Sequence, residues 1–136
     1  MRDVAYIALG SNLGDRQAHL ALARDRLTTL PGSRLLAVSS VEETAPIGPV
    51  AQGSFLNQMV ALETELEPEA LLDALHAIER EAGRTRRERW GPRTLDLDIV
   101  MFERQKLATE RLTVPHPELE RRDFWRRELA ELRANG

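Results

Sequence analysis

Two aspartates and a run of arginines lie close together in the second half of the chain, and their residue types suit phosphate chemistry. Residues 94–102 read TLDLDIVMF, and side chains alternate along a strand, so Asp96 and Asp98 share one face. The apolar residues expected on the other face are Leu95, Leu97, Ile99 and Met101. Two adjacent carboxylates repel each other unless a cation lies between them, and oxygen ligands without Cys suit Mg²⁺ better than Zn²⁺.

The loop before this strand is rich in arginine. Its arginines are Arg84, Arg86, Arg87, Arg89 and Arg93. Guanidinium groups bind phosphate oxygens bidentately, so an anion site is expected beside the metal site. The turn Trp90-Gly91-Pro92 fixes how the loop approaches the strand. This arrangement indicates phosphoryl transfer, and the alternative is a solvated strand face next to a solvated loop.

Composition sets limits on the class of protein. The chain has 136 residues with 42% hydrophobic content, which suits a single domain over 1–136. A net charge of −3 does not favour nucleic-acid binding, so the local arginines are expected to bind something small. Without Cys there is no disulfide framework, and no apolar run reaches the length of a membrane span or signal peptide. The chain is therefore expected to be cytoplasmic, and a monomer.

Apolar periodicity and turn residues predict the elements that position these groups. Strands are predicted at 4–9, 35–41, 55–66 and 94–102, and helices at about 16–30 and 68–82. The glycine-containing turn before the first helix matches no phosphate-loop fingerprint, so Asp15 is interpreted as an N-cap. The connection between the second and third strands is too short for a parallel crossover. The order is that of the split βαβ, ferredoxin-like fold, which predicts an α+β sandwich with helices packed on an antiparallel sheet.

Three polar side chains have more than one interpretation. Asn57 lies among apolar residues on its strand, where an amide either satisfies a structural hydrogen bond or recognises a ligand. His116 stands between two prolines that fix its backbone, so its imidazole can be directed at a ligand or have a structural role. His76 has no second ligand at a useful spacing, and it is expected to be exposed and without function, as is His19.

Long motifs then carry a resemblance to a known family. The run RWGPRTLDLDIVMF followed by ERLTVPHPEL resembles the 6-hydroxymethyl-7,8-dihydropterin pyrophosphokinases of folate biosynthesis. The segments VAYIALGSNLGD, ETAPIGP and FLNQMVALET also match, so the resemblance runs from Val4 to about Phe124. It implies Mg²⁺-dependent transfer of the β,γ-pyrophosphate of ATP to the hydroxymethyl group of the pterin, with release of AMP.

The resemblance also implies roles for individual residues. Two Mg²⁺ ions are held by Asp96 and Asp98, which count as catalytic together with Arg84 and Arg93 on a loop that closes over ATP. The residues implied for ATP are Arg84, Trp90, Arg93, His116 and Arg122. The pterin is stacked between Phe55 and Phe124, and the other residues implied to bind it are Asn57, Thr44, Ala45 and Ile47.

The end of the chain departs from the family pattern. The family continues past Phe124 through a segment resembling VLxPLxEIAP, whereas this chain reads WRRELAELRANG, so a shortened C-terminus is expected. The spacing of Trp125, Leu129 and Leu132 predicts an amphipathic helix over about 124–133 that covers the sheet and still delivers Arg122 and Phe124 to the site. Dimerisation through the same apolar stripe is the alternative.

Two other functions remain open at this point. One is a folded but inactive module that binds a pterin or nucleotide. The other is an unrelated two-metal nuclease or phosphatase, which would need a further carboxylate or His near the metals.

Overall fold

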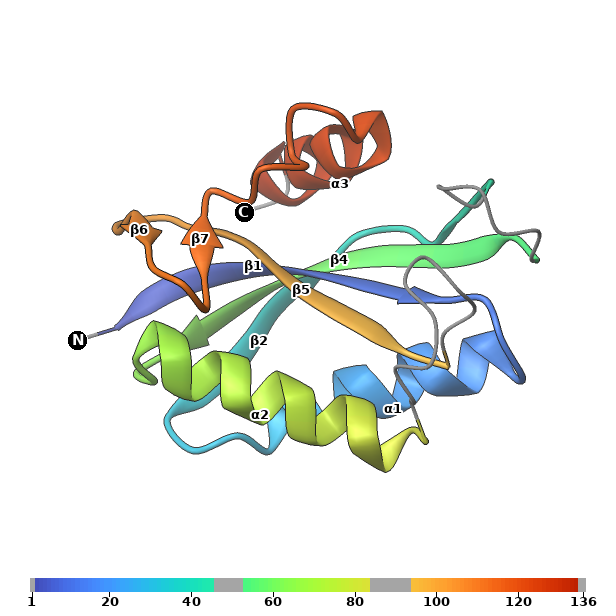
Figure 1. Ribbon diagram of the computed structural model, residues 1–136, viewed down its shortest axis with the longest axis horizontal. Coiled ribbons are helices and arrows are strands. Elements are labelled where there is room, and N and C mark those ends of the chain that lie inside the picture. Colours follow the sequence, from blue (N-terminus) through green and yellow to red (C-terminus); the bar gives the residue numbers. More distant parts are fainter. Residues whose placement is uncertain (1, 46–52, 84–93, 135–136) are drawn as a thin grey trace.

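The computed structural model describes residues 2–45, 53–83 and 94–134, and its main element is one antiparallel sheet (Figure 1). The strands are β1 (Asp3–Ser11), β2 (Ser33–Val38), β3 (Glu42–Thr44), β4 (Phe55–Thr64), β5 (Asp96–Phe102), β6 (Leu107–Ala108) and β7 (Thr113–Val114). The helices are α1 (Arg16–Thr28), α2 (Pro68–Glu81) and α3 (Asp123–Ala134). The strand order is β2-β4-β1-β5, with β3 also paired to β4. This is the expected split βαβ order, so the predicted fold class is confirmed.

Local signals place the ends of these elements. The carboxylate of Asp15 accepts a hydrogen bond from the backbone N–H of Ala18 at 3.0 Å, so Asp15 is the N-cap of α1 as predicted. Pro68 opens α2, where its missing N–H has no cost, and Gly83 follows the helix with a φ of 81°. Strand β1 is buried along almost its whole length, because it lies between β4 and β5 and is covered on both faces.

Helices cover both faces of the sheet (Figure 1). Helices α1 and α2 pack on one face, over a core that includes Ile7, Leu9 and Leu62. Helix α3 packs on the other face, and its buried side chains include Trp125, Leu129 and Leu132. The final helix predicted over about 124–133 is therefore confirmed, and it covers the second sheet face because that stripe is its only continuous apolar side.

Polar contacts fix α3 against the sheet at several points along its length. The guanidinium of Arg127 lies 3.2 Å from a carboxylate oxygen of Glu42 on β3, and that of Arg133 lies 2.9 Å from Glu103 just after β5. Glu131 accepts hydrogen bonds from both the backbone N–H and the hydroxyl of Ser40. Each contact joins α3 to a different segment in or next to the sheet, so together they fix the position of the helix.

Two details of the strand predictions are wrong. The strand predicted at 35–41 ends at Val38, because the buried hydroxyl of Ser39 accepts the backbone N–H of Met59 in place of a carbonyl. On β5, Ile7 pairs with Ile99 but Tyr6 pairs with Met101, so Val100 is an extra residue in a β-bulge. Met101 was expected on the face of Leu97, but the bulge moves it to the face that α3 covers.

Among the described residues, no helix is long and apolar enough to cross a membrane.

Candidate active site

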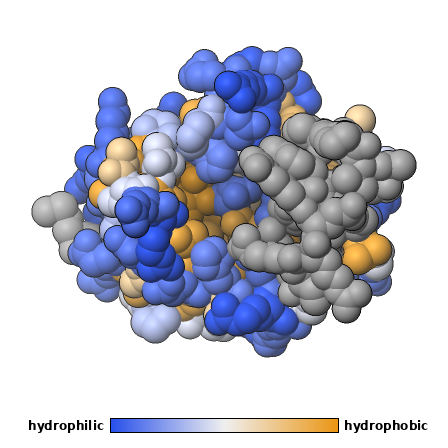
Figure 2. Space-filling model, in the orientation of Figure 1, coloured by the Kyte–Doolittle hydropathy of each residue, from blue (hydrophilic) through white to orange (hydrophobic). Residues whose placement is uncertain are grey.

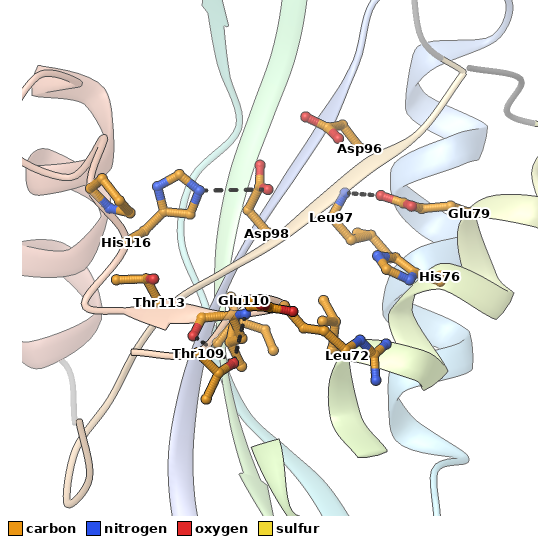
Figure 3. A pocket seen from close by; sticks show the side chains of 14 residues that line it. Leu72, His76, Glu79, Asp96, Leu97, Asp98, Thr109, Glu110, Thr113 and His116 are labelled. Atoms are coloured by element: carbon orange, nitrogen blue, oxygen red, sulfur yellow. Dashed lines mark hydrogen bonds and ion pairs between the residues drawn. The ribbon is translucent and has the colours of Figure 1, made fainter. Parts of the chain in front are cut away.

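A cavity of about 440 Å³ lies along β5, which is an edge strand of the sheet (Figure 3). Helix α2 forms one wall, and the segment from Thr109, just after β6, to Pro117 forms the other. Its lining includes Asp96 and Asp98, together with the apolar side chains of Leu72, Leu97, Ile99 and Leu112. Figure 2, which has the orientation of Figure 1, shows hydrophobic residues near the centre of the molecule, framed by hydrophilic ones. The cavity thus has an apolar part directly beside two carboxylates.

The two aspartates occupy the same face of β5, as the alternation predicted. Asp98 pairs with Ala8 and Asp96 pairs with Gly10 across the β1–β5 ladder, before the bulge changes the alternation. Both side chains are half-buried, and one carboxylate oxygen of Asp98 lies 3.9 Å from Nε2 of His116 (Figure 3). The edge strand therefore presents two oxygen ligands towards the side of the sheet that carries α3.

His116 is held beside Asp98 by the β-bulge. Its backbone N–H donates to the carbonyl of Val100, the extra residue of the bulge, at 2.7 Å. Its Nδ1 accepts the backbone N–H of Glu118 at 3.0 Å, so in the neutral ring the proton is on Nε2, which faces Asp98. Burial, followed by the charge of Arg122, lowers the pKa of His116. The imidazole is therefore kept neutral and can donate a hydrogen bond from Nε2.

Strand register gathers the predicted pterin residues near the aspartates. Gly10 on β1 pairs with Asn57 on β4 and with Asp96 on β5, so the three form one row across the sheet. A Cβ atom at Gly10 would lie 3.4 Å from the amide oxygen of Asn57 and 3.5 Å from the Phe55 ring. The amide nitrogen of Asn57 donates to the hydroxyl of Thr44 at 2.6 Å. The missing side chain at Gly10 leaves space between Asn57 and Asp96.

Two further predicted residues flank the start of α3. The guanidinium carbon of Arg122 lies 4.5 Å from the ring centre of Trp125. Phe124 is half-buried in the first turn of α3, and its ring centre lies 6.4 Å from that of Trp125. Ala45 is exposed at the end of a described range. The stacking of a pterin between Phe55 and Phe124 stays a prediction.

The remaining predicted site residues lie outside the described residues. They are Ile47, Arg84, Trp90 and Arg93.

The structure adds residues to the site that the sequence analysis missed. His76 was expected to be exposed, but it is half-buried and lines the cavity, because α2 packs along the β5 edge. His19 was also expected to be exposed, and this is wrong too, since His19 is half-buried and its Nδ1 lies 3.3 Å from the hydroxyl of Ser11.

Glu79 is the most deeply buried polar residue of the cavity wall, with 3% of its surface exposed. Its carboxylate accepts the backbone N–H of Leu97 at 2.8 Å, on the open edge of β5. A signal for it existed in the sequence, because Leu71, Leu75 and Glu79 follow one another at intervals of four on the same helix side. A carboxyl group in an apolar stripe needs a buried partner, and the edge strand supplies it.

Comparison with known proteins now decides the family. Residues 6–134 match the family model described as 7,8-dihydro-6-hydroxymethylpterin-pyrophosphokinase. The chain belongs to this family. A 2-amino-4-hydroxy-6-hydroxymethyldihydropteridine pyrophosphokinase of Bacillus subtilis is 48% identical over 97% of this chain and 79% of the relative. Enzymes of the same name are 50% identical in Pseudomonas aeruginosa (93% of this chain, 78% of the relative) and 47% identical in Pseudomonas putida (82% and 92%).

Membership of the pyrophosphokinase family confirms the resemblance seen in the sequence and the expected class of enzyme, a transferase of folate biosynthesis. A kinase of this family agrees with the expected use of ATP and magnesium. The number of metal ions, the monomeric state and the individual residue roles stay predictions.

Proposed function

We propose that this protein transfers the β,γ-pyrophosphoryl group of ATP to the hydroxymethyl group of 6-hydroxymethyl-7,8-dihydropterin and releases AMP, on the sheet face that α3 covers. The observation that carries the proposal is the row formed by Asn57, Gly10 and Asp96. Neighbouring strands are roughly 4.8 Å apart, so the amide and the carboxylate project from backbones roughly 10 Å apart with no side chain between them. A pterin held at Asn57 would thus direct its substituent towards Asp96.

The pterin side of the proposed site combines recognition with stacking. Asn57 is 7% exposed, and one N–H of its amide donates to Thr44, while its amide oxygen lies beside the space above Gly10 and can accept from a heterocycle N–H. Phe55 stands two residues earlier on the same strand face, next to the space above Gly10. A flat ring placed there would gain stacking with Phe55 in addition to the polar contact.

The two aspartates fit magnesium that arrives with a nucleotide. Mg²⁺ in phosphoryl-transfer sites is bound by one or two carboxylates, with phosphate oxygens and waters completing its six ligands. Asp96 and Asp98 supply that number of carboxylates from one strand face. Within residues 2–45, 53–83 and 94–134 there is no cluster of three or more His, Cys, Asp or Glu side chains that could hold a metal ion. The described residues therefore do not form a complete metal site made of protein ligands alone. We propose two Mg²⁺ ions here, which would neutralise the charge of the triphosphate.

The cavity along β5 suits the nucleoside part of ATP. Its apolar side chains can contact a purine ring, and the adjoining Asp98 places the phosphates near the metal ligands. His116 would donate from Nε2 to a phosphate oxygen, and Arg122 would supply a permanent positive charge. We also assign Trp90 to the nucleotide, and Arg84 and Arg93 to charge stabilisation on the transferred group, as the motifs imply.

One assay separates this function from its alternatives. Release of AMP from ATP should require both Mg²⁺ and 6-hydroxymethyl-7,8-dihydropterin, with one pterin diphosphate formed for each AMP. A protein that binds both ligands in titration calorimetry but forms no AMP would be an inactive binding module. Nucleotide cleavage that proceeds equally well without the pterin would instead indicate a hydrolase and contradict the proposal.

A further inference from the structure

Trp125 contacts two of the proposed phosphate-binding side chains at once. Trp125 belongs to the first turn of α3, and it is 2% exposed on the side of the helix that faces the sheet. The guanidinium of Arg122 lies over its ring at 4.5 Å from the ring centre, and the imidazole of His116 meets it edge to face, at 5.0 Å and 89°. Both distances and the perpendicular angle are in the range of favourable cation–π and aromatic contacts.

A ring face can orient an arginine without neutralising it. A carboxylate partner would occupy the in-plane N–H donors of Arg122 and cancel its charge, whereas stacking uses only the face of the guanidinium. The nearest carboxylate oxygen, on Glu118, lies 4.0 Å from Nε of Arg122, and among the described residues this Nε has no hydrogen-bond partner. Glu118 also accepts from Arg121 at 3.3 Å. The indole therefore holds the guanidinium of Arg122 by a contact that occupies none of its N–H donors.

His116 is held by contacts that leave Nε2 unused by the segment around it. Its Nδ1 and its backbone N–H are both used to fix the segment, and its ring also meets Trp125 edge to face. Nε2 is left directed at Asp98. One buried indole thus contacts two side chains that are both assigned here to the nucleotide.

We propose that Trp125 is a positioning residue, which aligns Arg122 and His116 for the triphosphate while leaving their N–H donors available. This inference rests on the proposed function, because it needs Arg122 and His116 to contact the nucleotide. It assigns to α3 a role in the reaction in addition to covering the sheet. Its specific requirement is the aromatic face, so an apolar side chain without a ring should not replace it.

Three variants test the requirement for a ring. Trp125→Leu keeps an apolar side chain without a π face, Trp125→Phe keeps the face, and Leu129→Ala is the control, since Leu129 is buried under the same helix. Trp125→Leu should lower kcat/KM for ATP about tenfold, and Trp125→Phe should recover most of the loss. Leu129→Ala should change kcat/KM by less than about twofold, even if it lowers Tm as much as Trp125→Leu does. Equal losses in the Phe and Leu variants that follow Tm would overturn the inference.

A second measurement distinguishes this inference from the proposed function. In an Arg122→Ala background, Trp125→Leu should cost less than about threefold, because the side chain it orients is gone. If Trp125→Leu still lowers kcat/KM tenfold in the Arg122→Ala background, Trp125 does not act through Arg122. If the unaltered protein forms no AMP, the proposed function fails. The positioning role of Trp125 is then tested by the affinity for the Mg²⁺ complex of a non-hydrolysable ATP analogue. Trp125→Leu should still weaken that affinity about tenfold, and an unchanged affinity would refute the positioning role.

Discussion

Replacing Glu128 with glutamine should stabilise the protein, by an amount that grows as the pH rises. Glu128 lies on the buried side of α3 with 1% of its surface exposed, and neither carboxyl oxygen has a hydrogen-bond partner among the described residues. The charged groups around it are Glu42 on β3 and Arg127 and Glu131 on α3. Burial, followed by the charge of Glu42, raises the pKa of Glu128 to about 8.

The size of the effect follows from the two pKa values. The ordinary value is 4.5, so the unfolded chain releases the proton well before the folded protein does at about 8. Because the folded pKa is the higher one, stability is unaffected below about pH 4.5 and falls by about 1.4 kcal/mol per pH unit up to about pH 8. The loss amounts to about 3 kcal/mol at pH 7 and levels off near about 5 kcal/mol above pH 8. Glutamine does not titrate, so it avoids this loss.

Urea unfolding followed by circular dichroism at about pH 5, 7 and 8.5 measures the difference. We expect Glu128→Gln to exceed the unaltered protein by less than about 1 kcal/mol near pH 5 and by about 3 kcal/mol at pH 7. Glu120→Gln is the matched control, because the Glu120 side chain is 87% exposed and should show no such trend. A Glu128→Gln variant with the same pH dependence as the unaltered protein would refute the reasoning.

Four further substitutions test the proposed site. Asp98→Ala should lower kcat for AMP formation at least about 10²-fold with an unchanged circular dichroism spectrum, and near-normal turnover would end its assignment to the metal. Gly10→Val should fill the space beside Asn57 and weaken pterin binding about tenfold in calorimetry while ATP binding is retained, and unchanged pterin affinity would place the ligand elsewhere. Phe124→Ala should weaken pterin binding by about 1 kcal/mol and ATP binding less, and equal losses would make it a core residue. Arg93→Ala should lower kcat about 10²- to 10³-fold, whereas an effect mainly on KM would indicate ground-state binding.

The sequence alone determined the elements whose signals are local. The spacing of Trp125, Leu129 and Leu132 predicted α3, and the alternation around Asp96 and Asp98 predicted that both carboxylates share a face. Such patterns repeat over a few residues and reflect how a helix or strand buries one of its sides. The motifs around them also determined the family, because they extend over most of the chain.

Only the tertiary structure decided which residues from distant segments lie together. The row of Asn57, Gly10 and Asp96 depends on strand register, which is set by the packing of whole strands and not by the residues of any one of them. The bulge at Val100 depends on its partner strand in the same way, yet it determines where His116 is held. The indole of Trp125 was predicted as core from its spacing, but its contact with two site residues arises from the position of α3 on the sheet, which many long-range contacts fix together.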